Sequence, residues 1–419
     1  MIKNKRPVTI ALVGEVDSGK STLIGVLNSG LYDDGKGKSR SEMLTMKHEK
    51  ESGKTSSIHS TITTINDTEV RFLDLAGHER YLNTTLSGLT KYYPDYALLM
   101  IGGQRGITQM TKEHIKICVS LEIPVIICIS KIDISPEKVL KNTLTTTRRL
   151  CKQVRIKFQD LVRNDEILDK CIKVFELNPF HLCPIFKISN ITGEGLDYLK
   201  IFISKLKYNE DNDTILYKFM EKNNIKKLFT IYKPYYVKGI GFVLYGINKG
   251  NDIKSGEILK IGPIYGKYHN IKIRSIHDKD RNIVNLLPSN SIGCLAIKCL
   301  DKHIKLSKKL MKRGQVIIDN PILVKSIVVL IQLFNQSITI KRNYNPYIYC
   351  CNIATTAIIT DIINNKGEKI ELMRTNDLGT IKMNLYTPQF IYPGEKILIR
   401  DGKVRGVGII KETLFEKNN

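Results

Sequence analysis

The chain has 419 residues, of which 42% are hydrophobic, and this is enough for two or three domains with buried cores. Its formal net charge of +24 suits a phosphate-rich partner such as RNA, and the alternative explanation is a compositional drift toward Lys, since Lys, Ile and Asn are abundant throughout the chain. No run of about 18 apolar residues exists to cross a membrane, and the nine cysteines lack the spacing of a zinc site or a disulfide framework. We therefore expect a protein of the reducing cytoplasm without a membrane span. We also expect it to be a monomer with no membrane partner.

A glycine-rich loop between a strand and a helix is the first predicted element. Residues 8–13 are apolar and β-branched, which predicts a buried parallel strand, and residues 20–24 begin a helix. The loop has the spacing of a phosphate-binding loop, whose backbone N–H groups surround phosphate oxygens. Lys20 is expected to reach the β- and γ-phosphates, and the Ser21 hydroxyl to ligate Mg²⁺. The predicted nucleotide-binding residues of this motif are Gly14, Glu15, Val16, Asp17, Ser18, Gly19, Lys20, Ser21 and Thr22.

Residues 31–64 are rich in Lys, Ser, Thr and Gly and are expected to form a loop. In one interpretation this loop is only a solvated connection. In the other it is the first switch segment, which orders over Mg²⁺ and the γ-phosphate when GTP is bound. One hydroxyl would then ligate Mg²⁺, and the spacing alone does not choose between Thr55, Ser56 and Ser57.

A second strand, at residues 70–74, ends in an acidic residue. This end of a strand faces the ligand in a parallel α/β sheet, so Asp74 is expected to hold Mg²⁺ through a water. Gly77 has no side chain, and its N–H can therefore approach the γ-phosphate. His78 follows directly. An isolated histidine is usually a surface or core residue, but behind an Asp-x-x-Gly motif His78 is the candidate that orients the attacking water.

The guanine-recognition motif follows a third buried strand, at residues 123–129. Asp133 is expected to accept hydrogen bonds from the N1–H and the exocyclic amine of guanine, a donor pair that adenine lacks. The stem of Lys131 is expected to lie along the base. The usual pattern here is Asn-Lys-x-Asp, so Ser130 departs from it. A shorter hydroxyl is expected to make fewer tethering bonds, which lowers affinity while Asp133 preserves selectivity.

A fourth strand, at residues 184–188, leads to a further short motif, Ser189 and Asn190. A backbone N–H of this motif is expected to contact O6 of guanine. The motif is informative only because it follows the other three in order. Together the four motifs predict that the chain binds GTP and GDP with Mg²⁺.

Strands and helices alternate up to about residue 207, which predicts a P-loop α/β domain over residues 1–208. Residues 209–225 begin with acidic and polar residues and are predicted to be a linker. Short β-rich runs separated by Gly, Asn, Asp or Pro turns then predict two antiparallel β-barrels, at residues 226–319 and 320–419. The predicted fold class is therefore multidomain, with an α/β P-loop GTPase domain followed by two antiparallel β-barrels.

With these motifs in place, the chain resembles the translational GTPases of the elongation factor Tu and elongation factor one-alpha superfamily. Within it, the chain is most similar to the eukaryotic GTP-binding-protein-one/two group. The best marker is the run Asp-Leu-Ala-Gly-His-Glu-Arg-Tyr at residues 74–81. The segments that carry the finer likeness are residues 55–57, 74–85, 131–133, 184–196, 241–246, 272–277 and 349–357.

The resemblance implies a GTP-hydrolysing factor in which His78 is catalytic. It also implies that Val16 belongs to an apolar gate beside His78 and that Asp17 helps to bind a monovalent cation. Ser57 would take the place of the switch residue that ligates Mg²⁺, so the implied metal-binding residues are Ser21, Ser57 and Asp74.

The resemblance further implies partners, namely the ribosome and aminoacyl-tRNA. In the family the two barrels hold the tRNA. Tyr347, Tyr349 and Arg400 are candidates for RNA contacts, although packing explains the tyrosines about as well.

Three functions remain open on these grounds. The first is a translation factor that delivers or positions tRNA, and the second is a ribosome-associated GTPase of translation quality control or mRNA turnover. The second would recruit an RNA-decay protein, and either could need an exchange-factor protein. The third is a nucleotide-gated scaffold with negligible turnover, against which the presence of Lys20, Asp74 and His78 argues.

Overall fold

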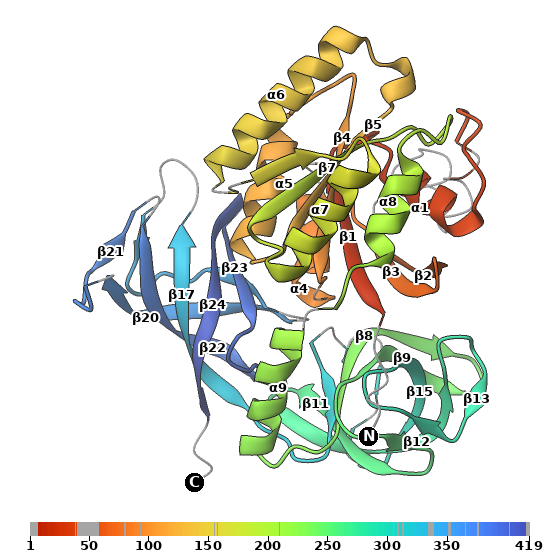
Figure 1. Ribbon diagram of the computed structural model, residues 1–419. Helices are drawn as coiled ribbons and strands as arrows, with labels where there is room; N and C mark the ends of the chain where they lie inside the picture. The colour runs from red at the N-terminus through yellow and green to blue at the C-terminus, as the bar shows by residue number, and fades with distance from the viewer. Residues whose placement is uncertain are drawn as a thin grey trace. The chain divides into compact units, whose positions relative to one another are not determined.

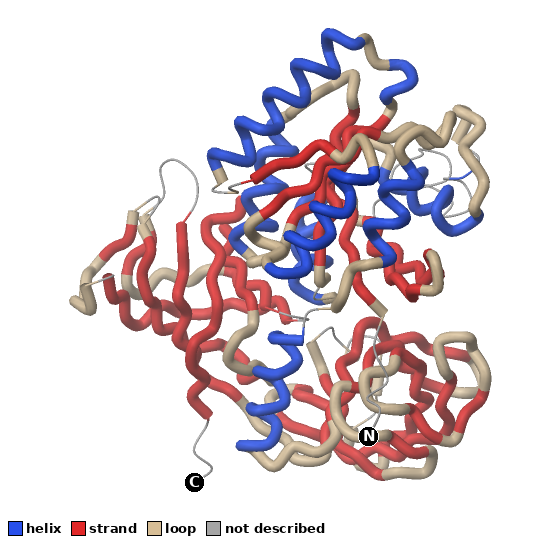
Figure 2. Tube along the Cα trace, in the orientation of Figure 1, coloured by secondary structure: helices blue, strands red, loops and turns tan. Residues whose placement is uncertain are grey.

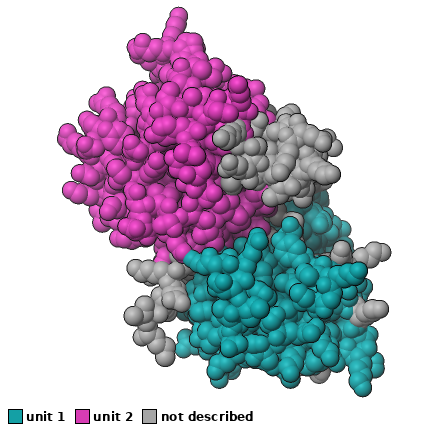
Figure 3. Space-filling model, turned by 90° about the vertical axis from the view of Figure 1, so that its right-hand side faces the viewer, with its two compact units in different colours: residues 1–6, 209–419 teal, residues 7–208 magenta. Residues whose placement is uncertain are grey.

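The structure is a computed structural model that divides into two compact units, residues 7–208 and residues 209–419 (Figure 3). It describes residues 7–37, 39, 58–78, 81–92, 94–154, 156, 158–208, 210–304, 306–307, 310–311, 314–333, 339–350, 353–364, 366–374, 377–401 and 403–415. Each unit has a hydrophobic core of its own.

A seven-stranded sheet forms the centre of the first unit, in the order β2-β3-β1-β4-β5-β7-β6. Its strands are β1 (Val8–Gly14), β2 (His59–Ile65), β3 (Thr68–Asp74), β4 (Tyr96–Gly102), β5 (Val125–Ser130), β6 (Phe158–Leu161) and β7 (Leu182–Lys187). All neighbours pair in parallel except β2 and β3, which are antiparallel. The central strands β1, β4 and β5 are near-continuous apolar runs. This composition suits strands that are buried on both faces of a parallel sheet.

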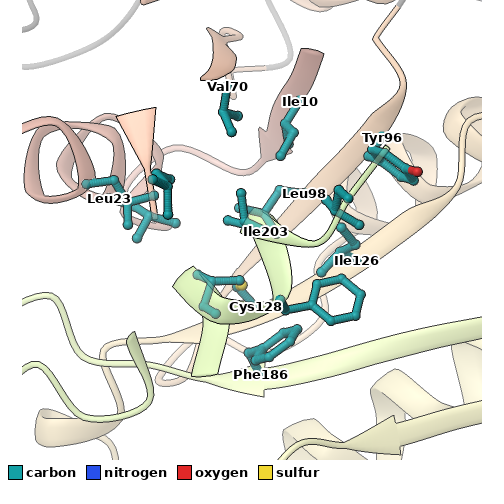
Figure 4. Close-up of a cluster of buried hydrophobic side chains, with 14 of the residues drawn as sticks. Ile10, Leu23, Val70, Tyr96, Leu98, Ile126, Cys128, Phe186 and Ile203 are labelled. Carbon is teal, nitrogen blue, oxygen red and sulfur yellow. The ribbon is translucent and has the colours of Figure 1, made fainter. Parts of the chain in front are cut away.

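Helices cover both faces of this sheet (Figures 1 and 2). They are α1 (Lys20–Ser29), α4 (Leu82–Lys91), α5 (Gln109–Ser120), α6 (Glu137–Gln153), α7 (Asp165–Leu177) and α8 (Leu196–Ser204). Side chains of α1, α7 and α8 share one core with Ile10, Leu98 and Phe186 of the strands (Figure 4). Helix α5 contacts β1, β4 and β5, and its buried residues lie outside that core, so it packs on the opposite face. The predicted α/β class of this unit is therefore confirmed.

The first barrel of the second unit is a closed ring of six antiparallel strands. They are β8 (Leu228–Val237), β9 (Gly241–Asn248), β15 (Ile292–Cys299), β12 (Lys267–His277), β11 (Ile258–Ile264) and β16 (Val316–Ile318). Pairing of β11 with both β12 and β16 closes the ring, and β13 (Ile283–Val284) is added to β12. A short pair, β10 (Ile253–Lys254) with β14 (Leu286–Leu287), forms a separate two-stranded sheet, and its Ile253 and Leu287 pack into the core of the barrel.

The second barrel is also a closed ring of six antiparallel strands. They are β17 (Val324–Leu333), β22 (Leu378–Gln389), β20 (Ile353–Asn364), β19 (Tyr347–Cys350), β23 (Lys396–Asp401) and β24 (Lys403–Phe415). A short pair, β18 (Ile340–Lys341) with β21 (Leu372–Met373), accompanies them. The two predicted barrels are therefore confirmed.

A helix, α9 (Glu210–Lys222), fills most of the range that the sequence suggested to be a linker. Its acidic first turn favours a helix start, and Leu216, Phe219 and Met220 then place apolar side chains on one face. That face shares a core with Leu228 of the first barrel and Phe390 of the second. Among the helices of the described residues, α9 included, none is long and apolar enough to cross a membrane.

Candidate functional site

The four sequence motifs meet at the carboxyl edge of the parallel sheet. Register pairs Leu12 with Asp74, Gly14 with Met100, and Gly102 with Ser130. The neighbouring strand β7 ends at Lys187, just before Ser189. Because parallel strands end at one edge, the loops that follow them form one continuous surface, which is where α/β sheets bind ligands.

The glycine-rich loop has the backbone conformation that its glycines allow. Gly14, Asp17 and Gly19 have φ values of 143°, 62° and 85°, in the region that side chains disfavour. A Cβ at Gly14 would stand 2.3 Å from the carbonyl oxygen of Met100. The Ser18 hydroxyl donates to the Glu15 carbonyl at 2.8 Å and stabilises the turn. No side chain caps α1 at Gly19, so the N–H groups of its first turn are available to a phosphate.

Lys20 lies buried at the centre of this loop, with 6% of its surface exposed. Its ammonium donates to the carbonyls of Gly14 at 3.1 Å and Glu15 at 2.8 Å. Burial lowers the pKa of Lys20 from its usual value, and the negative charge of Asp74 opposes that shift. The two carbonyl contacts hold the end of the Lys20 side chain inside the loop, where phosphate oxygens are predicted to bind.

Two of the predicted Mg²⁺ ligands, at the start of α1 and the end of β3, lie side by side. The Ser21 hydroxyl donates to a carboxylate oxygen of Asp74 at 2.5 Å, and both residues are buried. A hydroxyl and a carboxylate suit Mg²⁺, which prefers oxygen and keeps several waters. The third predicted ligand, Ser57, and its alternatives Thr55 and Ser56 lie outside the described residues.

Gly77 touches the glycine-rich loop, whereas His78 faces solvent. A Cβ at Gly77 would lie 2.5 Å from the Gly14 carbonyl oxygen, 2.5 Å from Nζ of Lys20 and 2.6 Å from the carbonyl carbon of Glu15. The His78 side chain is exposed, and its ring lies edge-on to that of Tyr81, with centroids 6.0 Å apart. The side chain predicted to orient the attacking water is therefore exposed next to Tyr81.

Ser130 links the guanine-recognition motif to the phosphate loop. It is fully buried, and its hydroxyl donates to the backbone carbonyl of Ser18 at 2.7 Å. The shorter side chain therefore still makes a tether between the two motifs. A second, longer contact joins the same hydroxyl to the Ile101 carbonyl at 3.4 Å.

We expect Ser130→Ala to accelerate GDP dissociation by about 5- to 10-fold, because it removes a buried hydrogen bond worth about 1 kcal/mol. Dissociation of a fluorescent GDP analogue measures this directly. Ser255→Ala, on the first barrel, is the control and should leave the rate unchanged. An unchanged rate in Ser130→Ala would contradict a tethering role.

The other residues predicted to bind guanine lie in two segments, one at residues 131–134 and one at residues 189–193. Lys131 has a left-handed backbone (φ 59°), which turns the chain into the short helix η2 (Ile132–Ile134), and Asp133 is exposed there. The Ser189 hydroxyl accepts from the N–H groups of Ile191 and Thr192 at 3.2 and 3.1 Å. Asn190 is buried. It lies beside the phosphate loop, with its Nδ2 3.5 Å from the position that a Cβ on Gly19 would occupy.

The segment after α1 contacts the loop that carries Ser189 and Asn190. The sequence did not indicate this contact. The N–H of Asp33 donates to the Asn190 carbonyl at 2.8 Å. The Tyr32 ring lies against Gly193, where a Cβ would stand 2.3 Å from its Cζ. The start of the predicted switch segment therefore contacts the loop that is predicted to bind the guanine O6.

Arg105 is a further residue that the sequence did not single out. It follows β4 in a loop, and its guanidinium lies 3.7 Å from the carboxylate of Asp17. Its other terminal nitrogen donates to the Val16 carbonyl at 3.4 Å. The two residues for which the resemblance implied a gate and a cation site are therefore both in contact with an arginine.

His114 of α5 is fully buried, and neither ring nitrogen has a hydrogen-bond partner among the described residues. Burial, with a smaller contribution from the positive charge of Lys20, lowers the pKa of His114 to about 3. The unfolded chain therefore binds a proton between pH 6.5 and pH 3 that the folded chain does not. This stability contribution is complete above pH 6.5 and is lost as the pH falls toward 3.

We expect the unfolding free energy to fall by about 1 kcal/mol between pH 7 and pH 5.5 on account of His114. His114→Gln, which cannot titrate, should flatten the pH dependence of the thermal midpoint over that interval. The exposed His303→Gln is the control and should keep the wild-type slope. Equal slopes in His114→Gln and wild type would contradict the assignment.

Residues 5–234, more than half of the chain, match the family described as "Elongation factor Tu GTP binding domain". GTP-binding protein 1 of Xenopus laevis is 31% identical over 443 residues, covering 98% of this chain and 64% of that protein. GTP-binding protein 2 of Homo sapiens is 28% identical over 433 residues, covering 96% of this chain and 69% of that protein. The chain thus spans less than two-thirds of the length of the Xenopus laevis relative.

Solved structures share the fold. Translation elongation factor SelB from Methanococcus maripaludis, in complex with the GTP analogue GppNHp, has a TM-score of 0.66 at 19% identity, covering 99% of this chain and 80% of that one. The Ski7 GTPase-like domain of S. cerevisiae, bound to GTP, has a TM-score of 0.66 at 14% identity, covering 97% of each chain. At such low identity the likeness is one of fold.

Proposed function

Because the chain belongs to the family defined by the elongation factor Tu GTP binding domain, we propose that this elongation-factor-like protein hydrolyses GTP to GDP and phosphate. We further propose that it acts in the cytoplasm on the ribosome and binds aminoacyl-tRNA in its GTP state. The observation that carries the first proposal is the contact between motifs far apart in sequence. Ser21 bonds to Asp74, and Gly77 packs on Gly14 and Lys20.

Each residue of the site has a part in the proposed reaction. The N–H groups of the glycine-rich loop and Lys20 would bind the β- and γ-phosphates. Ser21 and Asp74 would hold Mg²⁺, which neutralises charge on the phosphates. The N–H of Gly77 would contact the γ-phosphate, and His78 would orient the attacking water.

Base selection is assigned to the neighbouring motifs. Asp133 would accept the two donors of guanine, and Lys131 would lie along the base. Ser130 supports this arrangement because it bonds to Ser18, so the base and phosphate motifs form one body. The loop with Ser189 and Asn190 would complete the base site through a backbone N–H.

The proposal of an RNA partner is supported by the net charge of +24 and by the barrels. On the second barrel, Tyr347 is paired across strands with Arg400, and its ring meets that of Tyr349 at 5.2 Å between centroids. Tyr347 remains 42% exposed. An exposed aromatic ring beside an arginine suits stacking and phosphate contacts with RNA, so these three residues remain our candidates for tRNA.

The test is GTP hydrolysis by the purified protein with and without eukaryotic 80S ribosomes, together with His78→Ala. We expect strong ribosome stimulation, and we expect the variant to lose at least 100-fold of the stimulated rate while its GTP affinity stays unchanged. His303→Ala is the control. A rate unaffected by ribosomes would refute the translational assignment.

Measuring tRNA affinity in the GTP state separates the two ribosomal functions. A factor that delivers tRNA binds aminoacyl-tRNA more tightly with a GTP analogue than with GDP. Ribosome-stimulated hydrolysis without any such affinity would favour the quality-control or mRNA-turnover function instead.

A further inference from the structure

The loop that carries Arg105 is fixed between the phosphate loop and the guanine motif. The N–H of Gly103 donates to the Ser130 carbonyl at 2.8 Å, and the Gln104 side chain donates to the Ile134 carbonyl at 3.2 Å. A Cβ at Gly103 would stand 2.7 Å from Oγ of Ser135, so the loop lies close to the guanine motif. Arg105 follows these two anchors in the chain, so its backbone is held beside the guanine-recognition motif.

From that position Arg105 reaches the phosphate loop at two adjacent residues. It contacts the Val16 carbonyl at 3.4 Å and the Asp17 carboxylate at 3.7 Å. A pocket opens at this point, and its lining includes Arg105 together with Glu15, Ser18, Gly102 and Lys131. Lys131 is predicted to lie along the base, and the phosphate loop is predicted to bind the phosphates. Arg105 therefore lines the pocket between the predicted base site and the predicted phosphate site.

We propose that Arg105 is a further catalytic residue, an arginine supplied by the chain itself that stabilises charge on the phosphates during hydrolysis. This inference rests on the proposed hydrolysis of GTP. The oxygen of water forms a bond to the γ-phosphorus, and the bond from that phosphorus to the β–γ bridging oxygen breaks. The bridging electron pair remains on GDP, and the water protons pass to phosphate and solvent. Negative charge therefore grows on the bridging oxygen, where a guanidinium is most effective.

The resting contacts of Arg105 are suited to this role because they are weak. The Arg105 and Asp17 side chains are 55% and 46% exposed, and an exposed pair at this distance adds little to stability. The guanidinium can therefore exchange Asp17 for a phosphate oxygen at little cost. Asp17 holds Arg105 beside the phosphate loop until the nucleotide arrives. For the same reason, removal of Arg105 should not unfold the protein.

Single-turnover hydrolysis, with and without ribosomes, tests the proposal in wild type, Arg105→Ala and Arg105→Lys. By analogy with other catalytic arginines, we expect Arg105→Ala to lower the rate constant by about 100-fold or more while the GTP and GDP dissociation constants change less than about threefold. Arg105→Lys should recover only part of the rate, because an ammonium lacks the planar fork. Arg148→Ala, an exposed arginine of α6, is the matched control and should keep the wild-type rate.

Two further readouts distinguish a catalytic arginine from a merely structural one. Guanidinium added to Arg105→Ala should restore part of the rate, and it should leave wild type and Arg148→Ala unchanged. Wild type with GDP should bind aluminium fluoride, a mimic of the transferred phosphoryl group, more tightly than Arg105→Ala does. A rate in Arg105→Ala within threefold of wild type would overturn the proposal, as would a rate loss matched by lost affinity and not rescued by guanidinium. If wild type itself fails to hydrolyse GTP, the proposed hydrolysis fails first, and the role of Arg105 fails with it.

Discussion

Asp133→Asn is expected to lower the affinity for GTP and GDP by about a thousandfold or more and to transfer binding to xanthosine nucleotides. The carboxylate accepts from both the N1–H and the exocyclic amine of guanine, whereas an amide offers one acceptor and one donor. The NH₂ group of the amide then faces the NH₂ group of guanine, and neither of these two groups has an acceptor. Xanthine carries an oxygen in place of that amine and so restores both hydrogen bonds.

Titration of the variant with fluorescent GDP and XDP measures this exchange. Asp133 is exposed on a short helix, so its replacement should not disturb folding. Asp169→Asn, an exposed residue of α7, serves as the control and should keep the wild-type preference. If Asp133→Asn retained its preference for GDP over XDP, the base-reading role would have to move to another residue.

Gly77→Ala is the second change with a large expected effect. Its methyl group would collide with backbone atoms of Gly14 and Glu15 and with the Lys20 ammonium. Backbone cannot yield as a flexible side chain can, so the 75–77 segment must move away from the phosphate loop. Overpacking of this kind costs about 1–3 kcal/mol. We expect GTP affinity to fall roughly 10- to 100-fold, and ribosome-stimulated hydrolysis to be lost.

Gly102→Ala supplies the matched control for Gly77→Ala. Gly102 ends β4 at the same edge of the sheet, but a Cβ there would meet no atom within 4 Å. Thermal stability should stay within error of wild type, and nucleotide affinity should fall far less than in Gly77→Ala, because the added methyl group of Gly102→Ala meets no atom even though Gly102 lines the pocket. Equal losses in the two variants would show that any added methyl group at this edge is harmful, and the special contact of Gly77 would then be unsupported.

The fold was predictable because its signals are local. The apolar runs of β1, β4 and β5 are unbroken, which is the pattern of strands buried on both faces. The Gly, Asn, Asp and Pro turns between the later strands likewise predicted the two barrels. The range of α9 was less clear, since its polar start resembles a linker and its apolar residues appear only from Ile215 onward.

The site was predictable only where residues form a motif of fixed spacing. Lys20, Asp74 and Asp133 could be assigned in this way. Arg105 and Tyr32 could not, because each acts through a partner distant in sequence, Asp17 and Gly193 respectively. A lone arginine after a strand or a lone tyrosine after a helix carries no such spacing, and only the folded chain shows what it touches.

Helix α9 shares a hydrophobic core with residues of both barrels. Phe219 packs against Phe390 and Tyr392 of the second barrel, with ring centroids 6.3 and 5.9 Å apart, while Leu216 shares its core with Leu228 of the first. Melting either barrel would therefore expose apolar surface on α9 and weaken the other. The two barrels should thus behave as one cooperative folding unit, in which damage to the core of one lowers the melting temperature of both.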